Sequence, residues 1–293
     1  MGLGNLMGIE NGYSITAGAM SMCGGHGAAT AYGSTLVERG YEAAQDCGLA
    51  AATFGLIVSV LVGGPLSRRL IVKNNLKSVD TKSSVVQTAK EIKEELPMSD
   101  IMKNFVVILL CMALGIQLGN GISWLIGEAT GTPISLPDYI GAMIVSILVR
   151  NLNEKFHWYN YSQKVSDVVG SVTLDLFLSI AMMSIKLWQL LGLVGGLAVI
   201  VVVQALVLFS ISYFIMFRVL GKNYDAAIMC AGACGHMLGA TPTAMANMNA
   251  VCERYGYSKT AFLIVPIVGS FLVDIVYQPV TITLLNVFCP VIS

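Results

Sequence analysis

Long apolar runs constrain this sequence more than any other feature. Helices that could cross a bilayer are predicted at residues 45–66, 104–127, 137–150, 166–187, 192–217 and 260–289. A crossing helix needs about 20 mostly apolar residues, and in lipid it satisfies its own backbone hydrogen bonds. Charged residues make up only 12% of the chain, about half the share usual in soluble domains. The sequence therefore predicts an all-α polytopic membrane protein, embedded in a lipid bilayer.

Charge and cysteine content exclude several other classes. The formal net charge is zero, so we expect no nucleic-acid partner. The seven cysteines form no close CxxC pair. We therefore expect neither a disulfide framework nor a resident metal, and no cofactor.

The distribution of Lys and Arg orients the spans, because these residues accumulate in cytoplasmic loops. The polar stretch from Ser67 to Asp100 is rich in them, and we place this linker in the cytoplasm. Counting spans from there puts Arg150, Arg218 and Lys222 on the same side.

Residues 226–248 are apolar enough to be mistaken for a further span. If they dip into the membrane and return, Arg254 and Lys259 join the other cations in the cytoplasm. We expect Gly232, Gly235, Gly239 and Pro242 to break a helix, and broken backbone at membrane depth is tolerated where it lines an enclosed cavity. The sequence thus predicts a re-entrant loop.

An internal repeat links this loop to the start of the chain. Cys23–Ala31 and Cys234–Ala244 both run Cys, Gly, His, Gly, Ala, Thr, Ala with small insertions, and each is followed by Glu-Arg, a Gly/Tyr turn and an apolar span. The first of these spans ends at the cytoplasmic linker, whereas the second begins in the cytoplasm. The two copies are therefore predicted to be inverted, as in many secondary transporters.

The repeat is unequal in length. A symmetric protein would have about another 110 residues before Met1, so we expect a truncated first repeat, or a partner that supplies the missing spans. The predicted layout is a remnant of the first inverted repeat at 1–66, a cytoplasmic linker at 67–100, and the second repeat at 101–293.

Broken helices near the bilayer midplane can hold a carboxylate at helix N-termini and Na⁺ at unwound carbonyls. The Thr241–Asn247 run adds side-chain oxygens, the two repeated histidines are candidates for a proton or substrate contact, and a carboxylate in an apolar span is usually functional. The candidate substrate and ion residues are Gly24, Gly25, His26, Gly27, Gly239, Thr241, Pro242, Thr243, Asn247 and Asp274.

Simpler interpretations remain open for the same residues. Small residues also let membrane helices pack closely, and a buried histidine is often structural. Cys23 with His26, and Cys234 with His236, would suit a membrane hydrolase, but the sequence places no third catalytic group beside them.

Several motifs, in the same order along the chain, resemble the bacterial sodium/glutamate symporter family. They are Gly24–Gly27, Ala51–Leu56 with Gly63–Pro65, Lys186–Trp188, Gly221–Ala227, Leu238–Met248 and Glu253–Gly256.

This resemblance implies a non-enzymatic carrier of the bacterial inner membrane, built from two inverted five-helix halves that each contain a re-entrant loop. It implies uptake of L-glutamate coupled to Na⁺ by alternating access, in a homodimer, with the substrate region around Gly24–Gly27 and Gly239–Asn247 and with Asp274 nearby. The alternatives are a carrier of another small carboxylate, driven by protons or Na⁺, and a non-transporting remnant.

Overall fold

The computed structural model describes residues 1–78, 98–130, 138–190, 192–269 and 273–290. These residues form helices, and no strand occurs among them. In chain order the elements are α1 (Gly2–Leu6), α2 (Asn11–Ile15), η1 (Thr16–Met20), α3 (Gly25–Glu38), α4 (Ala44–Lys73), α5 (Met98–Thr130), α6 (Asp138–Phe156), α7 (Gln163–Ser184), α8 (Leu187–Leu190), α9 (Val194–Ile211), η4 (Ser212–Met216), α10 (Phe217–Val219), α11 (Tyr224–Met237), α12 (Thr241–Tyr255), α13 (Lys259–Ile267) and α14 (Val273–Phe288).

The chain divides into two compact units. The first contains Met1–Glu91 and Lys186–Pro290, and the second contains Ile92–Ile185. Within the described residues, three helical stretches are long and apolar enough to cross a membrane: Ala44–Lys73, Met98–Glu128 and Val194–Val219. They match three of the predicted spans, whereas α6 and α7 fall outside this group.

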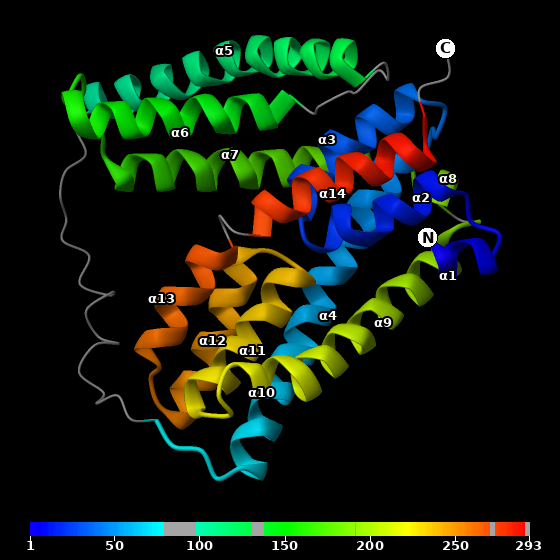
Figure 1. Cartoon of the computed structure of the whole chain (residues 1–293), viewed down its shortest axis with the longest axis vertical. Helices are drawn as coiled ribbons and strands as arrows, with labels where there is room; N and C mark the ends of the chain where they lie inside the picture. Colours follow the sequence, from blue (N-terminus) through cyan, green and yellow to red (C-terminus); the bar gives the residue numbers. More distant parts are fainter. Residues whose placement is uncertain (79–97, 131–137, 191, 270–272, 291–293) are drawn as a thin grey trace. The chain divides into compact units, whose positions relative to one another are not determined.

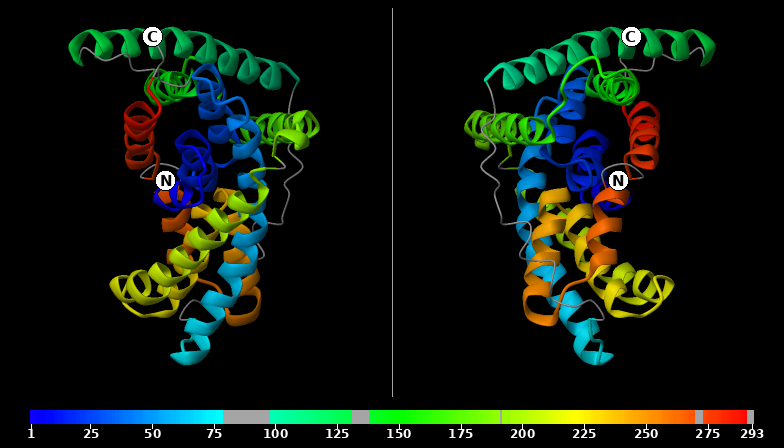
Figure 2. Two further views of the ribbon diagram at one scale, coloured as in Figure 1. Left: turned by 90° about the vertical axis from the view of Figure 1, so that its right-hand side faces the viewer. Right: turned by 90° about the vertical axis from the view of Figure 1, so that its left-hand side faces the viewer.

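Helix α4 packs against four other helices of the first unit, namely α3, α9, α11 and α12 (Figures 1 and 2). Three glycines spaced seven and eight residues apart allow this close packing. A Cβ on Gly48 would lie 2.6 Å from Thr16 Cγ2, one on Gly55 2.4 Å from the Leu238 oxygen, and one on Gly63 2.4 Å from Asn247 Nδ2. Small residues let helix backbones approach where packing, rather than exclusion of water, drives association.

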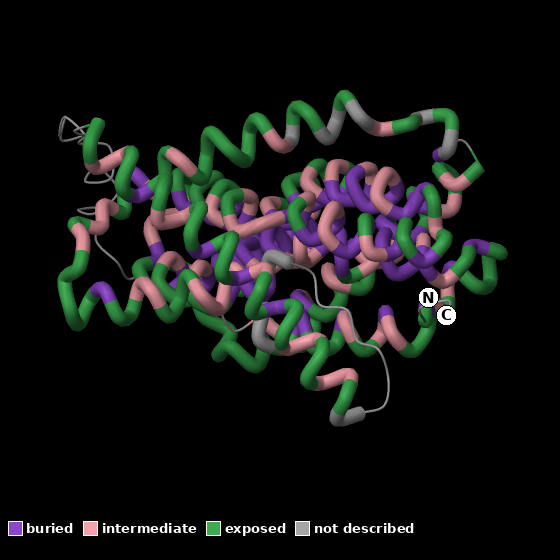
Figure 3. The backbone as a smooth tube through the Cα atoms, turned by 90° about the horizontal axis from the view of Figure 1, so that it is seen from above, coloured by how far each residue is buried: buried purple, intermediate pink, exposed green. Residues whose placement is uncertain are grey.

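The most buried element of the first unit is α11. Asn223 accepts a hydrogen bond from the Ala226 amide at 2.8 Å and so caps its N-terminus. Ala226, Ala227 and Ile228 are fully buried in a core that also takes in Leu66 and Met248, and buried residues of this kind are purple in Figure 3.

The structure adds detail to two of the predicted spans. Helix α4 extends beyond residue 66 to Lys73, because Leu70 and Ile71 still pack into the core. The predicted span over 260–289 falls on α13 and α14, and residues 270–272 between them lie outside the described residues. α13 packs on α11 and α12, whereas α14 packs on α2 and η1. The two halves of this segment thus have different neighbours.

Polar contacts fix α14 to the first part of the chain. The buried Arg39 guanidinium donates to the backbone oxygens of Leu285 and Cys289 and to Asn286 Oδ1. These acceptors lie at the C-terminal end of the helix, where the carbonyls lack intrahelical partners and a cation is favoured. The Tyr32 hydroxyl also donates to Gln278 Oε1.

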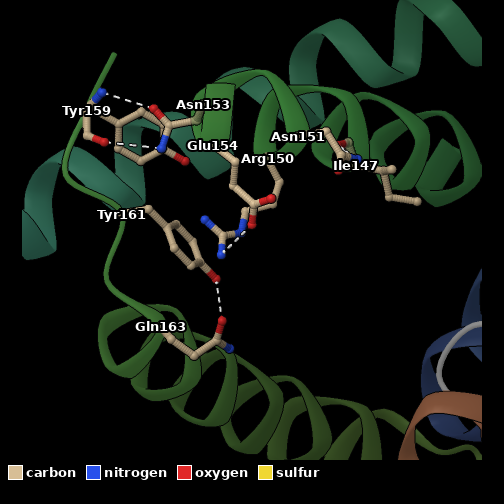
Figure 4. Close-up of polar contacts among 8 residues, drawn as sticks. All are labelled: Ile147, Arg150, Asn151, Asn153, Glu154, Tyr159, Tyr161 and Gln163. Atoms are coloured by element: carbon tan, nitrogen blue, oxygen red, sulfur yellow. Dashed lines mark hydrogen bonds and ion pairs between the residues drawn. The ribbon is translucent and has the colours of Figure 1, made fainter. Parts of the chain in front are cut away.

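The second unit contains α5, α6 and α7. A Cβ on Gly141 would lie 2.0 Å from the Gly115 oxygen, so α5 and α6 touch backbone to backbone. In the last turn of α6, Asn153 Nδ2 donates to the Tyr159 oxygen at 3.1 Å and Asn153 Oδ1 accepts from the Tyr159 amide at 3.0 Å (Figure 4). Arg150 pairs with Glu154 at 3.0 Å and lies over the Tyr161 ring, which gives the turn before α7 a defined conformation.

Candidate substrate site at two helix breaks

Each copy of the sequence repeat contains a short break in the helical path. The first break lies at Cys23 and Gly24, before α3, and the second at Leu238–Ala240, between α11 and α12. Gly25 has φ of +63°, a conformation that glycine adopts without strain. Pro242 lies in the first turn of α12, where its missing N–H costs nothing and its ring opposes helix on the upstream side.

Each break contains fewer non-helical residues than the glycine content predicts. The expectation that Gly232 and Gly235 interrupt a helix is wrong, since both lie within α11. They serve close packing instead: a Cβ on Gly232 would lie 2.8 Å from Val265 Cγ1, and one on Gly235 would lie 2.5 Å from the Ala244 Cα. The stretch from Gly25 to Ala31 is likewise helical.

The two breaks meet in space, although more than 200 residues separate them in the chain. The Cys23 and Met237 sulfur atoms are 3.8 Å apart, and a Cβ on Gly25 would lie 3.5 Å from the Gly239 oxygen. Helix α4 passes beside both breaks, because a Cβ on Gly55 would contact the Leu238 oxygen and, at 3.0 Å, the Met22 sulfur.

This arrangement places two helix starts and two carbonyl oxygens in one region. The first four amides of a helix have no intrahelical acceptor and carry a partial positive charge, so the starts of α3 and α12 favour an anion such as a carboxylate. Beside them, the carbonyl oxygens of Leu238 and Gly239 are hard ligands of the type that binds Na⁺ at unwound helices.

The repeated histidines have different partners. His26 Nε2 lies 3.1 Å from Thr53 Oγ1 of α4, and Thr53 also donates to the Leu49 oxygen at 2.9 Å. His236 Nδ1 lies 3.3 Å from Thr241 Oγ1, across its own break, and its ring packs against Gly269. His26 therefore links the first break to α4, whereas His236 and Thr241 bridge the second.

The remaining candidate site residues differ in their surroundings. A Cβ on Gly239 would lie 3.2 Å from Thr243 Oγ1, and a Cβ on Gly27 would meet no atom within 4 Å. Asn247 is buried, and its amide nitrogen donates to the Ser59 and Ala231 oxygens at 3.1 and 3.4 Å. Asp274 lies in the first turn of α14, and its side chain is outside the described residues.

Sequence reasoning missed the contribution of α4 to this region. Thr53 and Gly55 lie in the Ala51–Leu56 motif, which has no counterpart in the second loop. Tyr277, whose hydroxyl donates to the Met20 oxygen at 3.3 Å, was missed too. The signal for Thr53 is a hydroxyl among the small and apolar residues of a span.

Comparison with known proteins identifies the family of this chain. A sequence model described as sodium/glutamate symporter matches residues 1–257. The chain belongs to the sodium/glutamate symporter family. The sodium/glutamate symporter of Escherichia coli K12 is 35% identical over 280 residues, which cover 94% of this chain and 68% of that protein. The Haemophilus influenzae sodium/glutamate symporter is 34% identical over 276 residues, covering 92% and 67%.

No solved structure matches this chain. Membership of the symporter family, together with the three apolar helical stretches, makes it an integral membrane protein that transports rather than catalyses. The alignments with both relatives cover nearly the whole chain, so they include both helix breaks.

Proposed function

We propose that this protein imports L-glutamate across the bacterial inner membrane, coupled to Na⁺, with the two meeting helix breaks as the substrate and ion region. The observation that carries the proposal is the contact of Gly25 with the Gly239 oxygen, which brings the starts of α3 and α12 together. In a sodium/glutamate symporter family member, these amides suit an anionic amino acid.

The substrate carboxylates would bind at the first-turn amides around Gly25 to Gly27 and at Thr241 and Thr243. Na⁺ would bind among the Leu238 and Gly239 carbonyls, with Asp274 as a candidate carboxylate and Gly24 and Pro242 shaping the two breaks. A cation bound beside the anion lowers the cost of placing either charge in a low-dielectric site, so each ligand raises the affinity for the other.

Transport would proceed by alternating access. The two breaks would belong to inverted repeats, with residues 1–66 in the first, 67–100 as a cytoplasmic linker and 101–293 containing the second, and each break would form a re-entrant loop. The support for this layout is the helix break that each copy of the sequence repeat contains. We also propose that the working form is a homodimer.

Uptake of radiolabelled L-glutamate into proteoliposomes, with and without an inward Na⁺ gradient, tests the proposal. We expect accumulation only with the Na⁺ gradient, and competition by unlabelled glutamate. Accumulation that follows a proton gradient in Na⁺-free buffer would overturn the coupling. Competition by other small carboxylates but not by glutamate would overturn the substrate.

A further inference from the structure

A group of cations covers one face of α4 near its C-terminal end. Pro65, Arg68, Arg69, Val72 and Lys73 line a depression of about 700 Å³. Positions that follow Pro65 by three, four, seven and eight residues lie on one side of a helix. The lining therefore combines three positive charges with two apolar side chains and includes no acidic residue.

The opposite face of this segment is firmly packed. Leu66, Ser67, Leu70 and Ile71 are at most 3% exposed. Packing on that side fixes the rotation of the helix, so the cationic face is held outward. Val72, between the cations, is 58% exposed.

An aromatic ring rather than a carboxylate orients these cations. The Tyr213 hydroxyl of η4 accepts a hydrogen bond from Lys73 Nζ at 3.0 Å. Arg69 Cζ and Lys73 Nζ lie 5.8 and 5.4 Å from the centre of its ring, within the range of cation–π attraction. The two ion pairs found within the described residues both lie in the second unit, so neither neutralises this face.

The surfaces next to the depression are suited to acyl chains. α4 and the stretch Val194–Val219 are both apolar enough to cross a membrane. Exposed apolar side chains follow both helices below the cations, with Leu61 67% and Phe214 54% exposed. Tyrosine is enriched at the boundary between bilayer and water, so we assign Tyr213 and the cations to headgroup depth.

We propose that this face, formed by Arg68, Arg69 and Lys73, binds the phosphate headgroup of an anionic phospholipid in the cytoplasmic leaflet. Charge complementarity selects the headgroup, because three cations without an acidic neighbour attract an anion and Arg binds phosphate oxygens through paired donors. The orientation of α4 selects the leaflet, since its cationic end is cytoplasmic by the distribution of Lys and Arg. The acyl chains would lie along the apolar surfaces of α4 and α9.

Electron paramagnetic resonance of spin-labelled lipids tests this assignment in phosphatidylcholine bilayers that contain the full chain. We expect spin-labelled phosphatidylglycerol to associate more strongly than spin-labelled phosphatidylcholine. In the variant R68Q/R69Q/K73Q, we expect this preference to fall by about tenfold, because charge-assisted contacts to the phosphate are lost. A preference equal to that of the unaltered protein would overturn the proposal.

A matched variant distinguishes a specific lipid-binding site from diffuse attraction to a positively charged surface. K222Q/R254Q/K259Q removes the same charge from side chains that are also exposed in the first unit, and we expect it to keep the preference. An equal loss in both variants would mean that the attraction is diffuse. Because Lys73 is exposed, the lipid preference of the single variant K73Q can be compared with that of the unaltered protein even if the triple variant is unstable.

Inorganic phosphate distinguishes a lipid from a soluble anion. At millimolar concentration we expect it to leave the phosphatidylglycerol preference unchanged, because it lacks the acyl chains that would lie on α4 and α9. Complete displacement by phosphate would reassign the depression to a soluble anion.

Discussion

The backbone of Gly25 lies against the carbonyl oxygen of Gly239, so that a Cβ on Gly25 would be 3.5 Å from that oxygen. Each residue belongs to one copy of the sequence repeat, and each adjoins the start of a helix. The contact therefore joins the two breaks directly, with no intervening side chain.

Replacing Gly25 with Ala tests whether the first break depends on its backbone conformation. The added Cβ meets only an ordinary contact, but φ of +63° disfavours alanine by about 1–2 kcal/mol. We expect Gly25→Ala to lower the free energy of unfolding in detergent by that amount. Gly27→Ala, two residues on in the same helix and with no neighbour within 4 Å, is the control and should not destabilise. Equal stabilities would show that the break tolerates other conformations.

Gly27→Ala also tests the proposed substrate region, because its Cβ has open space around it in the absence of substrate. If glutamate binds at the first turn of α3, the methyl group should crowd it and raise the KM for uptake several-fold. Gly64→Ala adds the same methyl group in α4, where it also meets nothing, and should leave uptake unchanged. Unaltered KM in Gly27→Ala would place the substrate elsewhere.

The contact between His26 and Thr53 can be measured by a double-mutant cycle. We expect His26→Ala and Thr53→Val each to reduce stability, and their effects to be coupled by about 0.5–1.5 kcal/mol, the usual net value of a hydrogen bond. Thermal unfolding of the four proteins gives the coupling. Strict additivity of the two effects would show that the 3.1 Å contact contributes nothing to stability.

Arg39 and Arg254 occupy matching places in the repeat, and only Arg39 is buried. Arg39→Met should cost about 2–4 kcal/mol of unfolding free energy, because it removes three hydrogen bonds and leaves carbonyls at the end of α14 unpaired. Arg254→Met, at an exposed side chain, should change stability by less than about 0.5 kcal/mol. Similar costs for the two variants would contradict a capping role for Arg39.

Much of the fold follows from the sequence because its signals are local. Apolar runs predict α4, α5 and α9, and the motif spacing predicts that each copy of the repeat contains one break. Family membership, expected from the Leu238–Met248 motif and its companions, is confirmed.

The parts that sequence reasoning missed depend on contacts between distant segments. The sequence predicts that Gly232 and Gly235 break a helix, yet in α11 they face Val265 and Ala244. The close packing at these positions outweighs the low helix propensity of glycine. The Asn247 amide nitrogen donates to backbone oxygens of α4 and α11, contacts that the sequence did not indicate. The partners of these three residues could not be identified from the sequence alone.

The contact between Arg39 and Cys289 also has a consequence for biosynthesis. These residues are 250 positions apart in the chain, and ribosomes add about 5–20 residues per second. For roughly 10–50 s, the nascent protein carries an arginine whose final acceptors have not yet been translated. The first helix break can reach its mature packing only after α14 has been synthesised, so the packing around this break must be completed late, whatever the order in which the helices enter the membrane.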